Sequence, residues 1–318
     1  MKAPFPYFGN KTKAAPLVWD AFGDPSRYIE PFAGACGVLL GRPPHHGRRD
    51  EIVNDADGWL VNFWRAVQLR PADVHRHFDG WPVTEIDLAA RRAWLQQRRD
   101  DRLTNWLAGD PEHCDPKAAA WWLYVVSASI AAPMERGPWH VVDGHLTKTV
   151  SDRNGVVRGL PYVASRGKGA HLLTSESLSD LMGRLSRRLR HVRITCGDWA
   201  RVLTPVMFNK NTLTTANGDG SGAVLLDPPY TTGGDVYDDG DHGTDVSPAV
   251  TAWCEQADPT LRIVVCGYLD EHDRLLDHGW RKIDGARTTP TFRNGDTRRE
   301  RLWLSPACIE QQQLTLHC

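Results

Sequence analysis

Several features that would define the class of this 318-residue chain at once are missing from its sequence. The seven cysteines are odd in number and form no Cys-x-x-Cys pair, which argues against a disulfide framework and a structural zinc site. No internal repeat is present. Charge of one sign does not dominate either, because 38 Lys and Arg face 39 Asp and Glu. A globally basic, histone-like binder is therefore excluded, although a local basic face is not.

Long hydrophobic runs are also missing. Residues 1–11 hold no apolar run of the length that a secretory signal needs. The most apolar stretch, residues 118–134, contains two serines and is shorter than the ~20 residues of a membrane span. We therefore expect a buried helix there, no membrane association, and a cytoplasmic location, where cysteines stay reduced.

Charge is unevenly distributed along the chain. Residues 62–190 carry 19 Lys and Arg against 14 Asp and Glu, whereas the two flanks together are acidic. A basic middle between acidic pieces predicts an inserted domain that faces a polyanion. We predict a catalytic domain formed by residues 1–61 and 191–318, and a mainly helical insert formed by residues 62–190.

The flanks contain short apolar segments, most of which end in or next to Gly or Asp, a pattern typical of an open, mostly parallel α/β sheet around its ligand crevice. These predicted strands are residues 27–30, 51–55, 192–196, 223–226, 261–266 and 301–304. Helical periodicity predicts amphipathic helices over residues 87–99 and 175–191. In the second helix, the leucines at 178, 181, 185 and 189 are expected on the buried face.

The motif Asp227-Pro228-Pro229-Tyr230, directly after an apolar strand, carries the clearest chemistry. The prolines stiffen the turn. It would present the Asp227 carboxylate, the Pro228 carbonyl and the Tyr230 ring together. Two acceptors on an exocyclic amino group favour a localised nitrogen lone pair, and the ring stacks on a nucleobase. An ordinary Asp-Pro-Pro turn is the structural alternative.

Asp-Pro-Pro-Tyr is the catalytic motif of amino-methyltransferases that use S-adenosylmethionine. The two flanks, about residues 1–61 and 191–306, resemble the Dam-type DNA adenine-N6 methyltransferases found in many phage genomes. The resemblance implies a Rossmann-like, mostly parallel seven-stranded sheet with a target-recognition insert. It also implies S-adenosylmethionine as cofactor, no metal, and site-specific methylation of double-stranded DNA. Asp227, Pro228, Pro229 and Tyr230 would then be catalytic.

The resemblance also implies a set of cofactor-binding residues at five places in the chain. They are Tyr7 and Lys11 near the N-terminus, Glu30, Pro31, Phe32 and Gly34 in a glycine loop, Asp55 after the second strand, Asp198 and Trp199 after a later strand, and Asp227 itself. In that family the lysine lies by the cofactor carboxylate, the aspartate at position 55 binds the ribose, and residues 198 and 199 meet the adenine. Without the resemblance, Lys11 reads as a solvated lysine, and Asp55 and Asp198 as helix caps.

The glycine loop departs from the family pattern at its second glycine, where this chain has Cys36 followed by Gly37. A shift of the tight turn by one residue onto Gly37 would compensate, because glycine adopts left-handed dihedrals without strain. Three other functions stay open: N4-cytosine methylation, RNA methylation, and DNA binding without catalysis. A homodimer, a partner nuclease and the recognition sequence are also left open by the sequence.

Overall fold

The structure of the chain is a computed structural model. It describes residues 1–5, 7, 9–45, 47, 49–78, 84–98, 101–128, 139–142, 145–148, 170, 173–209, 218–229, 246–285 and 300–310. The predicted catalytic residue Tyr230 lies outside this described part.

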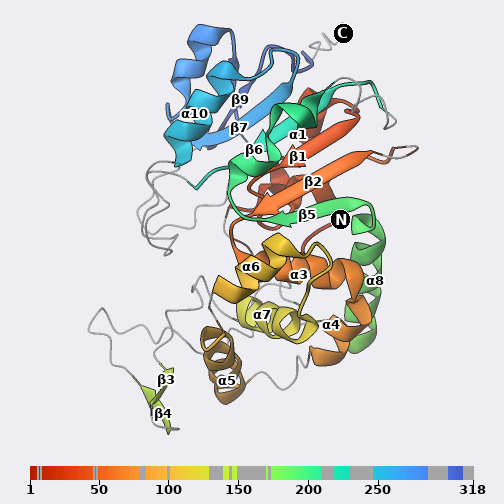
Figure 1. The fold of residues 1–318 in the computed structure, drawn as a ribbon, viewed down its shortest axis with the longest axis vertical. Coiled ribbons are helices and arrows are strands. Elements are labelled where there is room, and N and C mark those ends of the chain that lie inside the picture. The colour runs from red at the N-terminus through yellow and green to blue at the C-terminus, as the bar shows by residue number, and fades with distance from the viewer. Residues whose placement is uncertain are drawn as a thin grey trace, which may run out of the picture. The chain divides into compact units, whose positions relative to one another are not determined.

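Seven of the described strands form one mostly parallel sheet (Figure 1), as the sequence predicts. Across the sheet, the strands follow the order β5 (Val192–Cys196), β2 (Asp50–Asp55), β1 (Arg27–Glu30), β6 (Gly222–Leu226), β7 (Arg262–Tyr268), β9 (Glu300–Leu304) and β8 (Arg281–Asp284). β1 pairs in parallel with β2 and β6, and β6 pairs in parallel with β7. β9 runs antiparallel to both β7 and β8.

The middle of the sheet is apolar because its strands are buried on both faces. Ile29 lies opposite Ile52 on one side and Val224 on the other, and Val224 lies opposite Ile263. All four side chains are buried. Continuous runs of β-branched residues, without alternation, are typical of parallel strands covered from both sides. These residues belong to the main hydrophobic cluster of the sheet, which Trp303 of β9 and Trp280 extend.

The chain divides into two compact units. The first consists of Met1, residues 11–54 and residues 199–318, and the second of residues 2–10 and 55–198. The predicted boundaries at residues 61 and 191 stay a prediction. Among the described residues, no helix has both the length and the apolar character needed to cross a membrane.

In the first unit, short helices connect the strands. They are η1 (Lys11–Lys13), α1 (Ala15–Phe22), α2 (Gly37–Leu40), η3 (Trp199–Val202), η4 (Pro205–Phe208), α10 (Val246–Gln256) and η6 (Asp273–His278). α1 buries Val18, Trp19 and Phe22 and packs against α2 and β7. Pro16 in its first turn suits a helix start, since proline lacks the N–H that would be unpaired there.

The second unit is mainly helical. It contains α3 (Gly58–Leu69), α4 (Pro71–His77), α5 (Glu85–Gln96), α6 (Asp101–Gly109), α7 (Pro116–Ala128), α8 (Ser175–Leu189) and a two-stranded hairpin of β3 (Trp139–Val142) and β4 (His145–Lys148). α3 begins at the cap Asp57, whose side chain accepts from the backbone N–H groups of Trp59 and Leu60. α7 includes residues 118–128 of the apolar stretch predicted to be a buried helix, and it contacts α3, α4 and α5.

Two details differ from the sequence-based predictions. The buried face of α8 carries Met182 rather than Leu181, since the spacing of 178, 182, 185 and 189 follows the helical repeat more closely. β8 was not predicted, because three of the four residues in its sequence Arg-Lys-Ile-Asp are charged, as in a solvated segment. Such charged strands are usual at the edge of a sheet.

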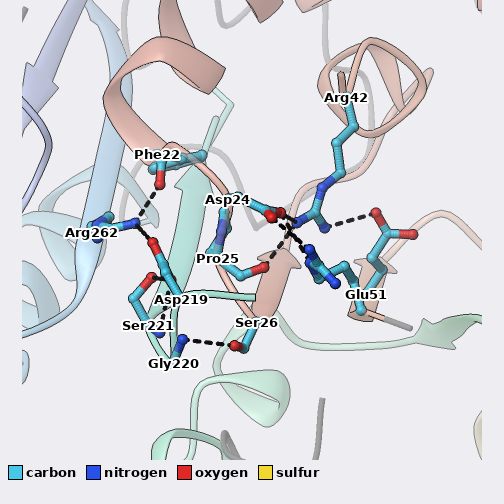
Figure 2. A network of polar contacts seen from close by, with 11 residues as sticks. Phe22, Asp24, Pro25, Ser26, Arg42, Glu51, Asp219, Gly220, Ser221 and Arg262 are labelled. Atoms are coloured by element: carbon cyan, nitrogen blue, oxygen red, sulfur yellow. Dashed lines mark hydrogen bonds and ion pairs between the residues drawn. The ribbon is translucent and has the colours of Figure 1, made fainter. Parts of the chain in front are cut away.

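A network of ion pairs connects residues at the amino ends of the strands (Figure 2). Arg42 contacts Glu51 at 3.0 Å and Asp24 at 3.3 Å, while Arg262 contacts Asp219 at 2.5 Å. Glu51 and Arg262 lie at the amino ends of β2 and β7. Ligands of open parallel sheets bind at the opposite, carboxyl ends of the strands. We therefore interpret this network as structural and look for the site at the other edge.

Candidate active site

The corner that follows β6 places a carboxylate at the carboxyl edge of the sheet. Every residue of β6 is buried, and the chain then reaches Asp227, whose side chain is 17% exposed. Pro228 is buried and Pro229 is half-buried. Because both prolines fix φ near −65°, the backbone of this corner has little freedom and holds Asp227 in place. Tyr230, the fourth residue of the motif, lies outside the described residues.

The carboxylate of Asp227 is paired with the ammonium group of Lys11. Lys11 Nζ lies 2.8 Å from Asp227 Oδ2 and 2.9 Å from Glu300 Oε1. The side chains of Lys11 and Glu300 are only 6% and 5% exposed. Burial alone would lower the pKa of Lys11, but the charges of Asp227 and Glu300 outweigh it and raise the pKa above its ordinary value. Lys11 is therefore a charged, buried lysine and not a solvated one.

Cys266 of β7 is the third group that converges on this place. Its sulfur and the carboxylate oxygens of Asp227 and Glu300 lie within 4.8 Å of one another. Burial, with the charge of Asp227, raises the pKa of the Cys266 thiol well above its ordinary value, so the thiol stays neutral. Since Lys11 already contacts both carboxylates and the thiol keeps its proton, we assign no metal to this group. That the protein uses no metal stays a prediction.

The loop between β1 and α2 carries four of the predicted cofactor residues. Glu30 ends β1, is buried, and accepts a hydrogen bond of 3.0 Å from the hydroxyl of Tyr28. Asn54 of β2 holds the next part of the loop: its side-chain amide donates to the Pro31 carbonyl at 3.1 Å, and its own carbonyl accepts from the Ala33 N–H at 2.9 Å. The loop is thus fixed to the neighbouring strand.

The turn of this loop uses two left-handed residues. Gly34 has φ +47°, and Cys36 has φ +51° and ψ +34°. The prediction that the turn shifts onto Gly37 is wrong, since Gly37 is the first residue of α2 and Cys36 itself takes the left-handed conformation. A residue with a Cβ there is strained by about 1–2 kcal/mol. The loop therefore keeps the turn at the position where the family has its second glycine.

Two aromatic rings lie face to face beside the first unit's sheet. Phe32 and Trp199 are stacked, with their ring centroids 5.8 Å apart and their planes at 26°. Trp253 meets Trp199 edge-on at 6.5 Å. Phe32 and Trp199 are both only half-buried. Trp199, predicted to meet the cofactor adenine, therefore belongs to an aromatic surface that it shares with Phe32.

The remaining predicted cofactor residues belong to the second unit. The carboxylate of Asp55 accepts a 3.0 Å hydrogen bond from the backbone N–H of Asp57, and the Asp55 carbonyl accepts from Gly197 at 3.0 Å. Asp57, and not Asp55, caps α3, so the reading of Asp55 as the helix cap is wrong. Asp198 is exposed, and Tyr7 is half-buried next to the ring of Phe5.

Sequence reasoning missed Glu300 and Cys266. Both residues lie on strands that the sequence does predict in part, β9 and β7. The signal was present for Glu300, because a glutamate at the start of an apolar strand is rarely buried without a partner. Its partner Lys11 could not be identified, because nothing in a single sequence shows which distant residue faces a buried carboxylate.

Comparison with known proteins shows which family part of this chain resembles. Residues 7–99 match the family model of the D12 class N6 adenine-specific DNA methyltransferases. A protein of Escherichia phage P1, named DNA N-6-adenine-methyltransferase, is 28% identical over 101 residues. That match spans 30% of this chain and 13% of the phage protein. Both findings confirm the family resemblance predicted from the motifs, and the family model covers Lys11, the glycine loop and Asp55.

Proposed function

We propose that this chain is a site-specific DNA methyltransferase that transfers a methyl group from S-adenosylmethionine to N6 of adenine in double-stranded DNA. The observation that carries the proposal is the Asp227 carboxylate at the end of a buried strand, held by two prolines at the carboxyl edge of the sheet. The match to the D12 class supports the choice of adenine.

The chemical role of the corner follows from the reactivity of the target nitrogen. An exocyclic amino group is a weak nucleophile, because its lone pair is delocalised into the ring. The Asp227 carboxylate and the Pro228 carbonyl would accept from its two N–H bonds, which localises the lone pair. The target base would leave the helix stack, and Tyr230 would stack on it. Holding the base in line with the methyl group is the main contribution.

The loop residues of the first unit fit the cofactor. S-adenosylmethionine supplies an electrophilic methyl group when it is bound. The left-handed turn at Gly34 lets the backbone approach a ligand closely, and the stacked pair of Phe32 and Trp199 offers an aromatic surface for an adenine ring. We propose that Lys11, Glu30, Pro31, Phe32, Gly34, Trp199 and Asp227 of this unit hold the cofactor. The cofactor roles of Tyr7, Asp55 and Asp198, which belong to the second unit, stay predictions.

The second unit offers a surface suited to DNA phosphates. We define the α5–α7 face by four residues: Trp94 on α5, Arg98 just after α5, and Lys117 and Trp121 on α7. Lys117 Nζ lies 4.5 Å from the centroid of the Trp121 ring and 5.2 Å from that of Trp94, and Arg98 Cζ lies 3.8 Å from Trp94. Neither cation forms an ion pair within the described residues, so both can contact phosphate.

The observed turn at Cys36 argues against the alternative of a DNA-binding protein without catalysis. That alternative depends on a glycine loop that has lost its shape through the cysteine. Cys36 instead takes the left-handed conformation itself. The loop backbone therefore keeps the turn that a close approach to a ligand needs.

The test is to incubate the purified chain with S-adenosylmethionine and unmethylated double-stranded DNA, and to measure methylated nucleosides by mass spectrometry. We expect N6-methyladenine. Formation of N4-methylcytosine would contradict adenine as the target base, and methylation of RNA but not of duplex DNA would contradict DNA as the substrate. Calorimetry with S-adenosylmethionine tests the alternative of a DNA-binding protein without catalysis. No heat of binding at millimolar cofactor would favour that alternative and contradict the cofactor assignment.

A further inference from the structure

The pairing of Lys11 raises a question of charge at the proposed catalytic carboxylate. Lys11 Nζ contacts Asp227 Oδ2 at 2.8 Å, in a place where the lysine is 6% exposed. A carboxylate paired with one ammonium is a neutral unit. Such a unit is a poorer acceptor for a nitrogen that becomes positive, because the nearby ammonium opposes that charge. Asp227 and Lys11 by themselves would therefore weaken the chemistry assigned to Asp227.

Glu300 changes this balance. Its Oε1 lies 2.9 Å from the same Lys11 nitrogen, and its side chain is 5% exposed, so water screens the interaction little. One ammonium is thus shared between two carboxylates, and the three groups together carry a net charge of −1. The ammonium contacts Oδ2 of Asp227, and the carboxylate has a second oxygen, Oδ1, with acceptor capacity of its own.

We propose that Glu300 is a positioning residue for methyl transfer, which shares Lys11 with Asp227 and so keeps Asp227 a strong acceptor for the adenine amino group. This inference rests on the proposed function. It assigns to Glu300 no contact with substrate. Its effect passes through the Lys11 ammonium to Asp227.

The electron and proton balance shows where the extra negative charge acts. The N6 lone pair forms the new bond to the methyl carbon, while the electron pair of the breaking carbon–sulfur bond stays on sulfur. The positive charge of the sulfonium is thereby transferred to N6. N6 then loses a proton to Asp227, from which it passes to water. A net charge of −1 at the three groups favours both the positive nitrogen and the proton transfer.

Other titratable groups around the three are the Cys266 thiol on β7 and Glu30 on β1. The thiol is buried and neutral, since burial raises its pKa well above the ordinary value. Glu30 accepts the hydrogen bond of Tyr28, and its charge acts on Cys266. Glu300 is one of the charges that raise the pKa of the Cys266 thiol, but burial is the larger cause and remains in Glu300→Gln, so the thiol should stay neutral in that variant.

The first arm of the experiment measures activity. Glu300→Gln keeps the shape of the side chain and removes its charge, whereas Glu300→Asp keeps the charge. Because a neighbouring charge changes proton affinity by about one to three pKa units, we expect the single-turnover methylation rate of Glu300→Gln to fall on the order of tenfold to a hundredfold. The acid limb of its pH–rate profile should also move to lower pH. Glu300→Asp should recover part of the rate.

The control variant is Glu51→Gln, which removes a buried glutamate paired with Arg42 at the opposite edge of the sheet. It is expected to lower thermal stability but to leave the pH–rate profile in place. A loss of rate in Glu300→Gln without a shift of the acid limb, or with no recovery in Glu300→Asp, would indicate mere structural damage and overturn the inference. Thermal melting of each variant reports whether it is folded.

The second arm does not depend on activity. Aspartate labelled with carbon-13 at the side-chain carboxyl is titrated by NMR in the wild type and in Glu300→Gln, with Asp227→Asn identifying the Asp227 signal. We expect the pKa of Asp227 to be lower in Glu300→Gln. An unchanged titration would overturn the inference even if the wild type methylates DNA. A shifted titration in a wild type that methylates nothing would overturn the proposed function instead.

Discussion

At the scale of single residues, Cys36 stands where the resembling methyltransferases have the second glycine of their cofactor loop. Its φ of +51° places a Cβ in the left-handed region, and its side chain is fully buried. We compare Cys36→Ala, which removes the sulfur but keeps the strain, with Cys36→Gly, which removes both. Cys36→Gly should be the more stable of the two by about 1 kcal/mol, because only glycine relieves the strain.

Thermal denaturation checks this ordering, since a difference of about 1 kcal/mol corresponds to roughly 2 °C in Tm for a chain of this size. Calorimetry with S-adenosylmethionine should show binding in both variants if the loop keeps its turn. If Cys36→Gly were less stable than Cys36→Ala, the left-handed conformation at this position would be contradicted.

His272 is the residue most directly linked to the pH dependence of stability. It is fully buried, contacts Thr251 Oγ1 through Nδ1 at 2.7 Å, and lies edge-on to Trp303. Burial lowers the pKa of His272, although the nearby charges of Glu271 and Asp273 oppose this. The folded state therefore holds His272 neutral. Its contribution to stability is present above the unfolded pKa of about 6.5 and is lost as pH falls through that value.

We therefore expect the Tm of the wild type to fall more steeply between pH 8 and pH 5 than that of His272→Gln, which has no group to protonate there. The exposed His278 provides the matched control, and His278→Gln should follow the wild type. Equal pH dependence in wild type and His272→Gln would mean that His272 is not held neutral by the fold.

At the scale of elements, we propose the α5–α7 face of the second unit as a contact for a phosphate backbone. Lys117→Met removes a cation that lies over two tryptophan rings. If it contacts phosphate, the slope of log affinity against log salt should decrease by about 0.9, the value for one released counterion. Binding to fluorescently labelled duplex DNA at several salt concentrations measures the slope.

Arg184→Gln is the control for the α5–α7 face, because Arg184 is an exposed cation of the second unit that already pairs with Asp180 at 3.1 Å. Its salt slope should match that of the wild type. An unchanged slope in Lys117→Met would exclude the α5–α7 face as a phosphate contact and move the search to other parts of the second unit.

The elements also show which parts of a fold a single sequence can predict. β1 and β5 were predicted to the residue, because apolar runs ending at Gly or at a carboxylate have a clear physical meaning in parallel sheets. β8 was missed because an edge strand can be as polar as a loop. In α8, the prediction placed Leu181 on the buried face because it is a leucine, whereas the helical repeat places Met182 there.

At the scale of the whole molecule, the candidate site depends on residues from both ends of the chain. The motif around Asp227 was predicted from local sequence, whereas its pairing with Lys11 and Glu300 requires the folded sheet. A local motif predicts the type of chemistry, because the residues that form the turn and supply the side chains are neighbours in the sequence. It does not predict the net charge of the site, which depends on which distant residues come together in the fold.

The proposed division of labour makes a final prediction for the intact protein. Asp227→Ala removes the acceptor for the target amino group but none of the other proposed cofactor contacts. We expect methyl transfer to duplex DNA to be abolished, while S-adenosylmethionine binding measured by calorimetry stays within a few-fold of the wild type. DNA affinity should also be retained, since backbone contacts to phosphate supply most of it. Retained methyl transfer would contradict the role of the carboxylate, and loss of all three activities together would show that Asp227 supports the fold and not the reaction.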